Sequence, residues 1–253
     1  MVPVGDHRWT TPLDADWFGS WAPHGGQLAA QLLRAIAAEA ADPTLSVRTL
    51  TVHFTSRAEP GQLDIKTRLE RRGRTLVTLS ARATQNGKLV AIALAGLGSD
   101  RPGPVLHDAR MPEVPGPGLL SAPSDQARLA APPVMNHYDF RFAIGKPFSR
   151  GQALAGGWVR PRPARAADHL LITVFADIWM PPIYMALDGP VPTATVELTV
   201  NYVASPDGLD PAAWFLTVFQ APVSQAGYYR EEGEVWSEQG RLLARCSQLG
   251  VFI

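Results

Sequence analysis

The sequence predicts an α+β protein made of two similar halves, each with one helix packed against an antiparallel sheet. Helix-like and strand-like segments follow in nearly the same order twice, and two short sequences recur at similar spacing. Eight of the 23 prolines fall in residues 99–135, where they forbid a helix interior or a central strand. We therefore expect a first repeat at 1–98, a connection at 99–135 and a second repeat at 136–253.

One amphipathic helix begins the first half. In residues 27–41 apolar side chains recur at the i, i+3, i+4 and i+7 positions of a one-sided helix, which Asp42-Pro43 ends. Residues 47–54 alternate between apolar and polar, as in a half-buried strand. Asn86-Gly87 predicts a hairpin, because both residues tolerate positive φ. Further strands are expected at 63–71, 75–84 and 88–97.

The second half repeats this order. Asp168 is the predicted N-cap of a helix at 169–179, which Pro181-Pro182 ends. Strands are expected on both sides of this helix, at 137–143, 154–160, 195–202, 214–221, 228–237 and 241–253. The helix is apolar on nearly all sides, so it should be buried.

Two short sequences indicate an internal duplication. Residues 50–54 (LTVHF) match 198–202 (LTVNY) at an offset of 148, and residues 85–91 (QNGKLVA) match 238–244 (EQGRLLA) at an offset of 153. A helix and an antiparallel sheet must each bury one face against the other. We therefore expect a double hotdog fold, in which two fused, helix-wrapped sheets can pair edge to edge.

Composition excludes several classes of function. Lys plus Arg and Asp plus Glu both total 23, so no net charge draws the protein to nucleic acid or to an anionic membrane. No apolar run approaches the roughly 20 residues that span a bilayer, and the N-terminus lacks a signal-peptide pattern. Cys246 is the one cysteine, and the six histidines show no metal-ligand spacing. We expect a cytoplasmic protein without a metal.

Two polar residues of the second half occupy positions where apolar residues are expected. Asp177 lies within the apolar helix predicted at 169–179, where a buried carboxylate is costly unless it is paired or functional. By alternation Gln248 shares a face of the last strand with Leu242, Ala244 and Cys246, so it points inward. Asp177 could instead be a satisfied core residue, and Gln248 could lie at a fraying strand end.

Thr195 is the third candidate, although threonine is common in strands. Alternation places it on the face opposite Val196 and Leu198. The first half has no polar counterparts of the three candidates: the offsets pair them with Ala29, with Val47, and with Ala95 or Gly96. If the three residues act together, the protein has one site per chain.

The turn at Gly25-Gly26-Gln27 opens the first helix. Free N–H groups and the positive end of the helix dipole make such a turn suitable for binding a developing oxyanion. Glycine allows a ligand to approach the backbone closely. The turn could equally be an ordinary helix entry, and His24 before it is a less favoured candidate for a catalytic base.

These residues resemble a known family. His24-Gly25-Gly26-Gln27 opening a helix, the strand at 50–54 and the hairpin at 85–88 resemble the first half of thioesterase II, the double-hotdog acyl-CoA thioesterases. In that family an Asp on the second-repeat helix, a Thr beginning the next strand and a Gln near the C-terminus hold the attacking water. The matching residues are Asp177, Thr195 and Gln248.

The resemblance implies a function in lipid metabolism, the hydrolysis of acyl-CoA to a free acid and CoA by direct attack of water. Asp177 would be the general base, and no cofactor would be required. Two alternatives remain open: a hotdog protein that binds acyl-CoA without turnover, and a hydratase or dehydratase. The fused pair already satisfies the usual hotdog dimer, and association into a homo-oligomer is left open.

Overall fold

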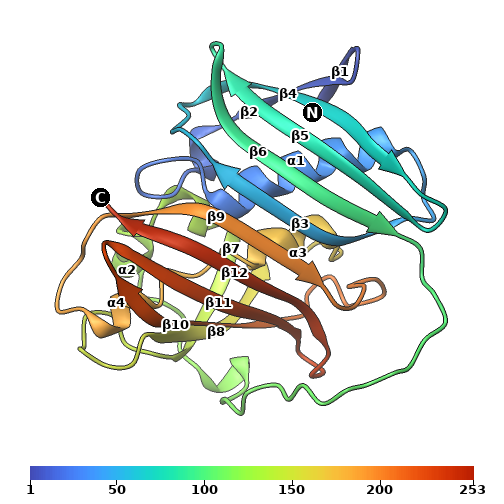
Figure 1. The fold of residues 1–253 in the computed structure, drawn as a ribbon. Coiled ribbons are helices and arrows are strands. Elements are labelled where there is room, and N and C mark those ends of the chain that lie inside the picture. Colours follow the sequence, from blue (N-terminus) through green and yellow to red (C-terminus); the bar gives the residue numbers. More distant parts are fainter.

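The computed structural model describes residues 1–253, which form one continuous twelve-stranded antiparallel sheet with helices on one face (Figure 1). Its strand order is β1-β2-β4-β5-β6-β3-β9-β12-β11-β10-β8-β7. The strands are β1 (Val2–Gly5), β2 (Arg8–Leu13), β3 (Ser46–Phe54), β4 (Gly61–Arg72), β5 (Leu76–Gln85), β6 (Lys88–Gly98), β7 (Tyr138–Ile144), β8 (Leu154–Pro161), β9 (Thr193–Tyr202), β10 (Phe215–Gln225), β11 (Tyr228–Ser237) and β12 (Leu242–Phe252). The helices are α1 (Gly25–Ala40), α2 (Asp125–Leu129), α3 (His169–Phe175) and α4 (Ile183–Ala186). The predicted α+β class is confirmed.

The two halves meet at β3 and β9, which pair at the centre of the sheet. Thr51 lies opposite Thr199, and their hydroxyl oxygens are 2.9 Å apart. The register is symmetric about this pair. The offset of 148 residues that relates the two threonines also relates the residues of the pair on one side to those of the pair on the other. Those pairs are Leu50 with Val200 and Val52 with Leu198. The pairing follows the repeat detected in the sequence, and the residue boundaries of the two repeats stay a prediction.

Helix α1 packs its apolar face on the sheet of the first half. Leu32, Leu33 and Ile36 are almost completely buried, and burial of each contributes about 1.5–3 kcal/mol to stability. The helix contacts β3 to β6 and also α3 of the second half. It ends at Ala40, because Ala41 adopts a left-handed conformation with φ of 50°. The helix begins at Gly25, two residues earlier than predicted.

The second helix is shorter than predicted. Asp168 is its N-cap, as expected, but α3 ends at Phe175. The carbonyl oxygens of Ala176 and Asp177 then accept hydrogen bonds from side chains of β12 and of the loop before α1. These carbonyls accept hydrogen bonds from outside the helix and not from a further helical turn. Asp177 therefore lies just beyond the helix and not inside it.

An N-terminal hairpin extends the first half and was not predicted. Strands β1 and β2 are joined at Asp6 and His7, which both have positive φ, 49° and 59°. Strand β2 then pairs with β4 at the edge of the meander. Proline and adjacent threonines interrupt the apolar alternation of β2, so its strand character is weak in the sequence.

The proline-rich connection covers the outer face of the second half. Trp158, Leu216 and Trp236 alternate with core residues along β8, β10 and β11, so they form a separate apolar cluster on the other face of the sheet. The indole N–H of Trp158 donates to the carbonyl oxygen of Pro115 at 2.9 Å. Met111, Val114 and Leu120 of the connection pack on this cluster. Figure 1 shows the connection running from β6 around the lower sheet.

The single cysteine is buried in the sheet of the second half. Cys246 is buried in β12, and its thiol donates to the carbonyl oxygen of Ala176 at 3.3 Å. No helix combines the length and the apolar character that crossing a membrane requires. No three His, Cys, Asp or Glu side chains are grouped closely enough to hold a metal ion.

Candidate active site

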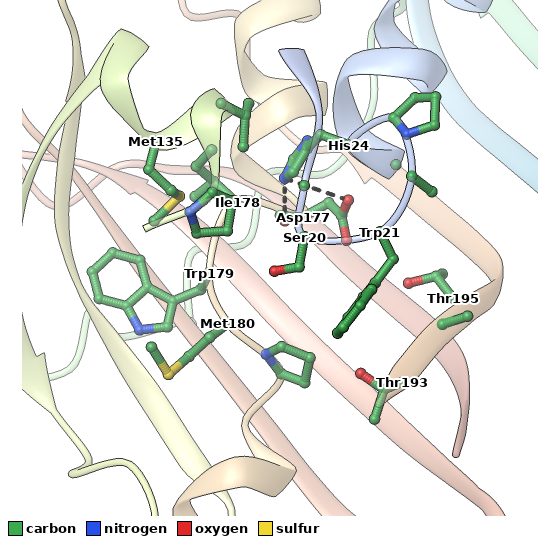
Figure 2. Close-up of a pocket in the computed structure, with 18 of the residues that line it drawn as sticks. Ser20, Trp21, His24, Met135, Asp177, Ile178, Trp179, Met180, Thr193 and Thr195 are labelled. Atoms are coloured by element: carbon green, nitrogen blue, oxygen red, sulfur yellow. Dashed lines mark hydrogen bonds and ion pairs between the residues drawn. The ribbon is translucent and has the colours of Figure 1, made fainter. Parts of the chain in front are cut away.

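One cavity of about 1010 Å³ lies between the two halves and the end of the connection. Of its 41 lining residues, 22 are hydrophobic, so it suits a ligand with a large apolar part. Figure 2 shows Asp177 in the wall of this cavity, with Thr193 and Thr195 to one side of it and Trp179 and Met180 to the other. Met135 of the connection also lines it, so the predicted connection contributes a wall that sequence reasoning missed.

Asp177 is held by backbone and side-chain donors from both halves. Its Oδ2 accepts a hydrogen bond from the Gly26 N–H at 2.6 Å, and its Oδ1 accepts one from Gln248 Nε2 at 2.9 Å. The side chain is 13% exposed, and that exposure is toward the cavity it lines. The donor at Gly26 belongs to the first turn of α1, where the helix dipole also favours a negative charge.

Glycine is required where α1 meets the end of α3. A Cβ at Gly25 would lie 2.8 Å from Asp177 Oδ2, and a Cβ at Gly26 would lie 2.9 Å from the Val174 carbonyl oxygen and 3.0 Å from Asp177 Cβ. These separations are shorter than ordinary contacts between carbon and its neighbours. The two glycines therefore allow the N-terminus of α1 to approach Asp177 directly.

His24 is the N-cap of α1 and fixes the loop against Asp177. Its Nδ1 accepts from the Gln27 N–H at 3.2 Å, so the proton of the neutral ring is on Nε2. Nε2 donates to the main-chain carbonyl oxygen of Asp177 at 2.9 Å (Figure 2). Both ring nitrogens are engaged in this arrangement, which suits a structural role for His24 better than that of a base.

Gln248 and Thr195 meet beside Asp177. Thr195 Oγ1 donates to Gln248 Oε1 at 2.9 Å, and Gln248 is 5% exposed. The prediction that Thr195 faces away from Leu198 is wrong. A bulge in the pairing of β9 with β12 leaves Val196 without a partner, so Thr195 and Leu198 share the inner face.

A second bulge changes the inward row of β12. Val235 pairs with Ala244 and Trp236 with Leu242, so Leu243 is the extra residue. Leu242 therefore packs with the outer cluster and not on the inward face that was predicted for it. Gln248 itself points inward as expected.

The three expected oxyanion donors have different surroundings. The Gly26 N–H donates to Asp177, and the Gln27 N–H donates to the ring of His24. Gly25 lines the cavity, whereas Gly26 and Gln27 do not. As the first residue of α1, Gly25 has an N–H that helix geometry leaves without an intrahelical acceptor.

Glu231 is a fourth polar residue of the site, and sequence reasoning missed it. It lies opposite Gln248 in the pairing of β11 with β12 and is 5% exposed. Burial raises the pKa of its carboxyl well above the usual value, and the negative charge of Asp177 raises it further. Glu231 shares the inward row of β11 with Tyr229 and Val235, but Arg230 before it and Glu232 and Glu234 after it obscure that row.

Comparison with known proteins assigns both halves to one family. The acyl-CoA thioesterase N-terminal domain matches residues 13–98, and the acyl-CoA thioesterase C-terminal domain matches residues 109–252. The human protein acyl-coenzyme A thioesterase 8 is 33% identical over 118 residues. That alignment spans 43% of this chain and about a third, 36%, of the human protein.

Solved structures share the whole architecture. A protein of unknown function with a hotdog fold from Alicyclobacillus acidocaldarius is 28% identical, with a TM-score of 0.92 over 100% of this chain and 96% of that one. A putative thioesterase II from Thermobifida fusca is 22% identical, with a TM-score of 0.86 over 100% and 94% of the two chains. The predicted hotdog fold is confirmed. Because the two family domains together cover most of its length, this chain belongs to the acyl-CoA thioesterase family.

Proposed function

We propose that this protein hydrolyses acyl-CoA to a free carboxylic acid and CoA by direct attack of water, with Asp177 as general base. The observation that carries the proposal is the Asp177 carboxyl at the cavity wall, held by the Gly26 N–H and the Gln248 amide. Family membership supports the thioester class of substrate. No step of this reaction requires a metal or an organic cofactor.

The attacking water would be held between Asp177, Gln248 and Thr195. Each Asp177 oxygen retains acceptor capacity, and Gln248 Oε1 uses one lone pair to accept from Thr195. A water bonded to Asp177 and to Gln248 Oε1 directs both protons at acceptors and keeps a lone pair for the substrate. As its oxygen bonds to the thioester carbon, one proton passes to Asp177.

The tetrahedral intermediate then releases the thiolate of CoA. We assign the Gly25 N–H as an oxyanion donor, because it borders the cavity, and a donor of this kind typically contributes about 3 kcal/mol. The C–S bond breaks as the carbonyl reforms, and the proton on Asp177 is returned to the thiolate or to solvent. A thiol with a pKa near 8.5 needs little acid assistance to leave.

The apolar part of the cavity would receive the acyl chain. Trp179, Met180 and Met135 form one wall, opposite Thr195 (Figure 2).

Balanced charge and a single buried cysteine support a cytoplasmic role in the metabolism of acyl-CoA. Light scattering would show whether copies associate further.

The test is thiol release from acyl-CoAs of increasing chain length, with wild type beside Asp177→Asn. The amide cannot act as a base at neutral pH, so we expect kcat to fall by about 10²–10⁴-fold with the fold intact. Asp188→Asn is the matched control, because Asp188 is exposed and pairs only with Arg150 at the surface. Wild type that binds acyl-CoA without turnover would identify a binding protein, and equal activity in both variants would remove Asp177 from the mechanism.

A further inference from the structure

The side-chain amide of Gln248 is held by three groups from three different elements. Its Oε1 accepts from Thr195 of β9 at 2.9 Å. Its Nε2 donates to Asp177 Oδ1 at 2.9 Å and to Glu231 Oε1 of β11 at 3.4 Å. Both N–H groups are therefore committed to carboxyl oxygens, and the remaining capacity of the amide is one lone pair on Oε1.

We propose that Glu231 is a positioning residue that fixes the orientation of the Gln248 amide for water activation. The inference rests on the proposed thioester hydrolysis and extends it to a residue on a strand that carries none of the other groups. Glu231 lies directly opposite Gln248 across the two strands, so it reaches the amide without crossing the cavity.

The second N–H of Gln248 decides how the water is held. If that N–H were free, it would donate to the water and occupy the lone pair that must attack the thioester carbon. With Glu231 as its acceptor, Gln248 presents only its carbonyl oxygen to the water. A reversed amide would direct Oε1 at the acceptor oxygen of Asp177, so the observed orientation, with Nε2 toward Asp177 and Glu231, is favoured.

The surroundings of Glu231 raise its pKa and so favour its neutral form. The titratable groups that face it are Asp177 beyond α3, Tyr229 of its own strand and Cys246 of β12, and none of them is a cation at neutral pH. Burial raises the pKa of Tyr229 and that of Cys246 as well, so neither supplies a charge beside Glu231 near neutral pH. A protonated Glu231 accepts from Gln248 through its carbonyl oxygen and adds no repulsion to Asp177.

Three substitutions separate reach from charge. Glu231→Gln keeps an acceptor oxygen at the same reach without a charge, and we expect its kcat to stay within about threefold of wild type. Glu231→Asp keeps the acid but is one methylene shorter, and the existing distance is already 3.4 Å. Glu231→Leu removes the acceptor. In Glu231→Asp and in Glu231→Leu we expect kcat to fall about tenfold or more and KM to stay within twofold of wild type, because the second N–H of Gln248 is buried and loses its acceptor.

The pH profile provides a signature that a purely structural role would not produce. In wild type, ionisation of Glu231 adds a second negative charge near Asp177, which opposes the negative charge that develops in the transition state, so kcat should decline as pH rises through the raised pKa of Glu231. Glu231→Gln should lack that decline. Full activity of Glu231→Leu, or a pattern in which Glu231→Asp is active and Glu231→Gln is not, would overturn the proposal.

A readout independent of turnover keeps this test separate from that of the proposed function. The Gln248 side-chain NH₂ signals can be assigned in the NMR spectrum by their loss in Gln248→Met. We expect them to exchange slowly and separately in wild type and in Glu231→Gln, and to exchange faster in Glu231→Leu. If wild type shows no turnover but this pattern holds, the positioning of Gln248 stands while the assigned reaction fails. Identical exchange in all three proteins refutes the positioning role.

Discussion

Gly26→Ala adds one methyl group at the point where α1 meets Asp177. The new Cβ would lie 2.9 Å from the Val174 carbonyl oxygen and 3.0 Å from Asp177 Cβ. Carbon contacts are optimal at about 3.5–4.0 Å, so Asp177 must move by roughly 0.5 Å or more. The groups that must move are the backbone of Val174 and the short side chain of Asp177, so the displacement directly shifts the Asp177 carboxyl.

The displacement should affect activity more than stability. Overpacking costs about 1–3 kcal/mol, and the higher helix propensity of alanine returns up to about 1 kcal/mol. The hydrogen bond from the Gly26 N–H to Asp177 Oδ2, 2.6 Å long, is charge-assisted and worth about 1.5–3 kcal/mol. Its loss corresponds to a decrease in kcat of roughly 10- to 150-fold. Overpacking, offset by helix propensity, lowers the free energy of unfolding by about 0–3 kcal/mol.

Thiol release and urea unfolding of the same preparations measure both quantities. Gly118→Ala is the matched control, because a Cβ there meets nothing within 4 Å and both activity and stability should be unchanged. Wild-type kcat in Gly26→Ala, with unaltered unfolding, would show that the approach of α1 to Asp177 is not needed for catalysis.

Two further predictions concern stability. The folded-state pKa of Glu231 is raised above 4.5, so above that pH the native state holds up to one more proton than the unfolded state, and the free energy of unfolding falls by up to about 1.4 kcal/mol per pH unit until Glu231 ionises. Glu231→Gln should lack this loss. Free energies from urea unfolding that change in parallel for wild type and Glu231→Gln from pH 4 to 8 would contradict the prediction. Trp158→Ala should lower the free energy of unfolding by about 3–5 kcal/mol and leave kcat unchanged, because Trp158 is 3% exposed and packs in the outer cluster away from the cavity; a loss of activity in protein that remains folded would show that the outer cluster supports the site.

Regular periodicity predicted most elements, and departures from it account for the errors. Alternation gave the inward position of Gln248 correctly, because no bulge intervenes between it and Cys246. It failed for Thr195 and Leu242, since each lies beyond a bulge that shifts the chain by one residue. A bulge depends on pairing with the neighbouring strand, so the sequence of one strand does not reveal it.

Long-range contacts explain what composition could not show. Proline content correctly indicated that residues 99–135 contain no strand, but it did not reveal that this segment packs on Trp158 and that its end lines the cavity with Met135. The end of α3 was also missed, because its sequence stays apolar through Trp179. Just beyond its end, the carbonyls of Ala176 and Asp177 accept tertiary hydrogen bonds that the sequence does not reveal.

The asymmetry of the two helices explains why one site can form in a symmetric fold. The offset that relates β3 to β9 places Asp177 at the equivalent of Ala29, which is completely buried within the continuous helix α1. In the second half the equivalent stretch is broken into α3, a turn and α4, and the break carries Asp177 and the cavity wall at Trp179. An intact helix supplies the N–H at Gly26, and a broken one supplies the acid that accepts it.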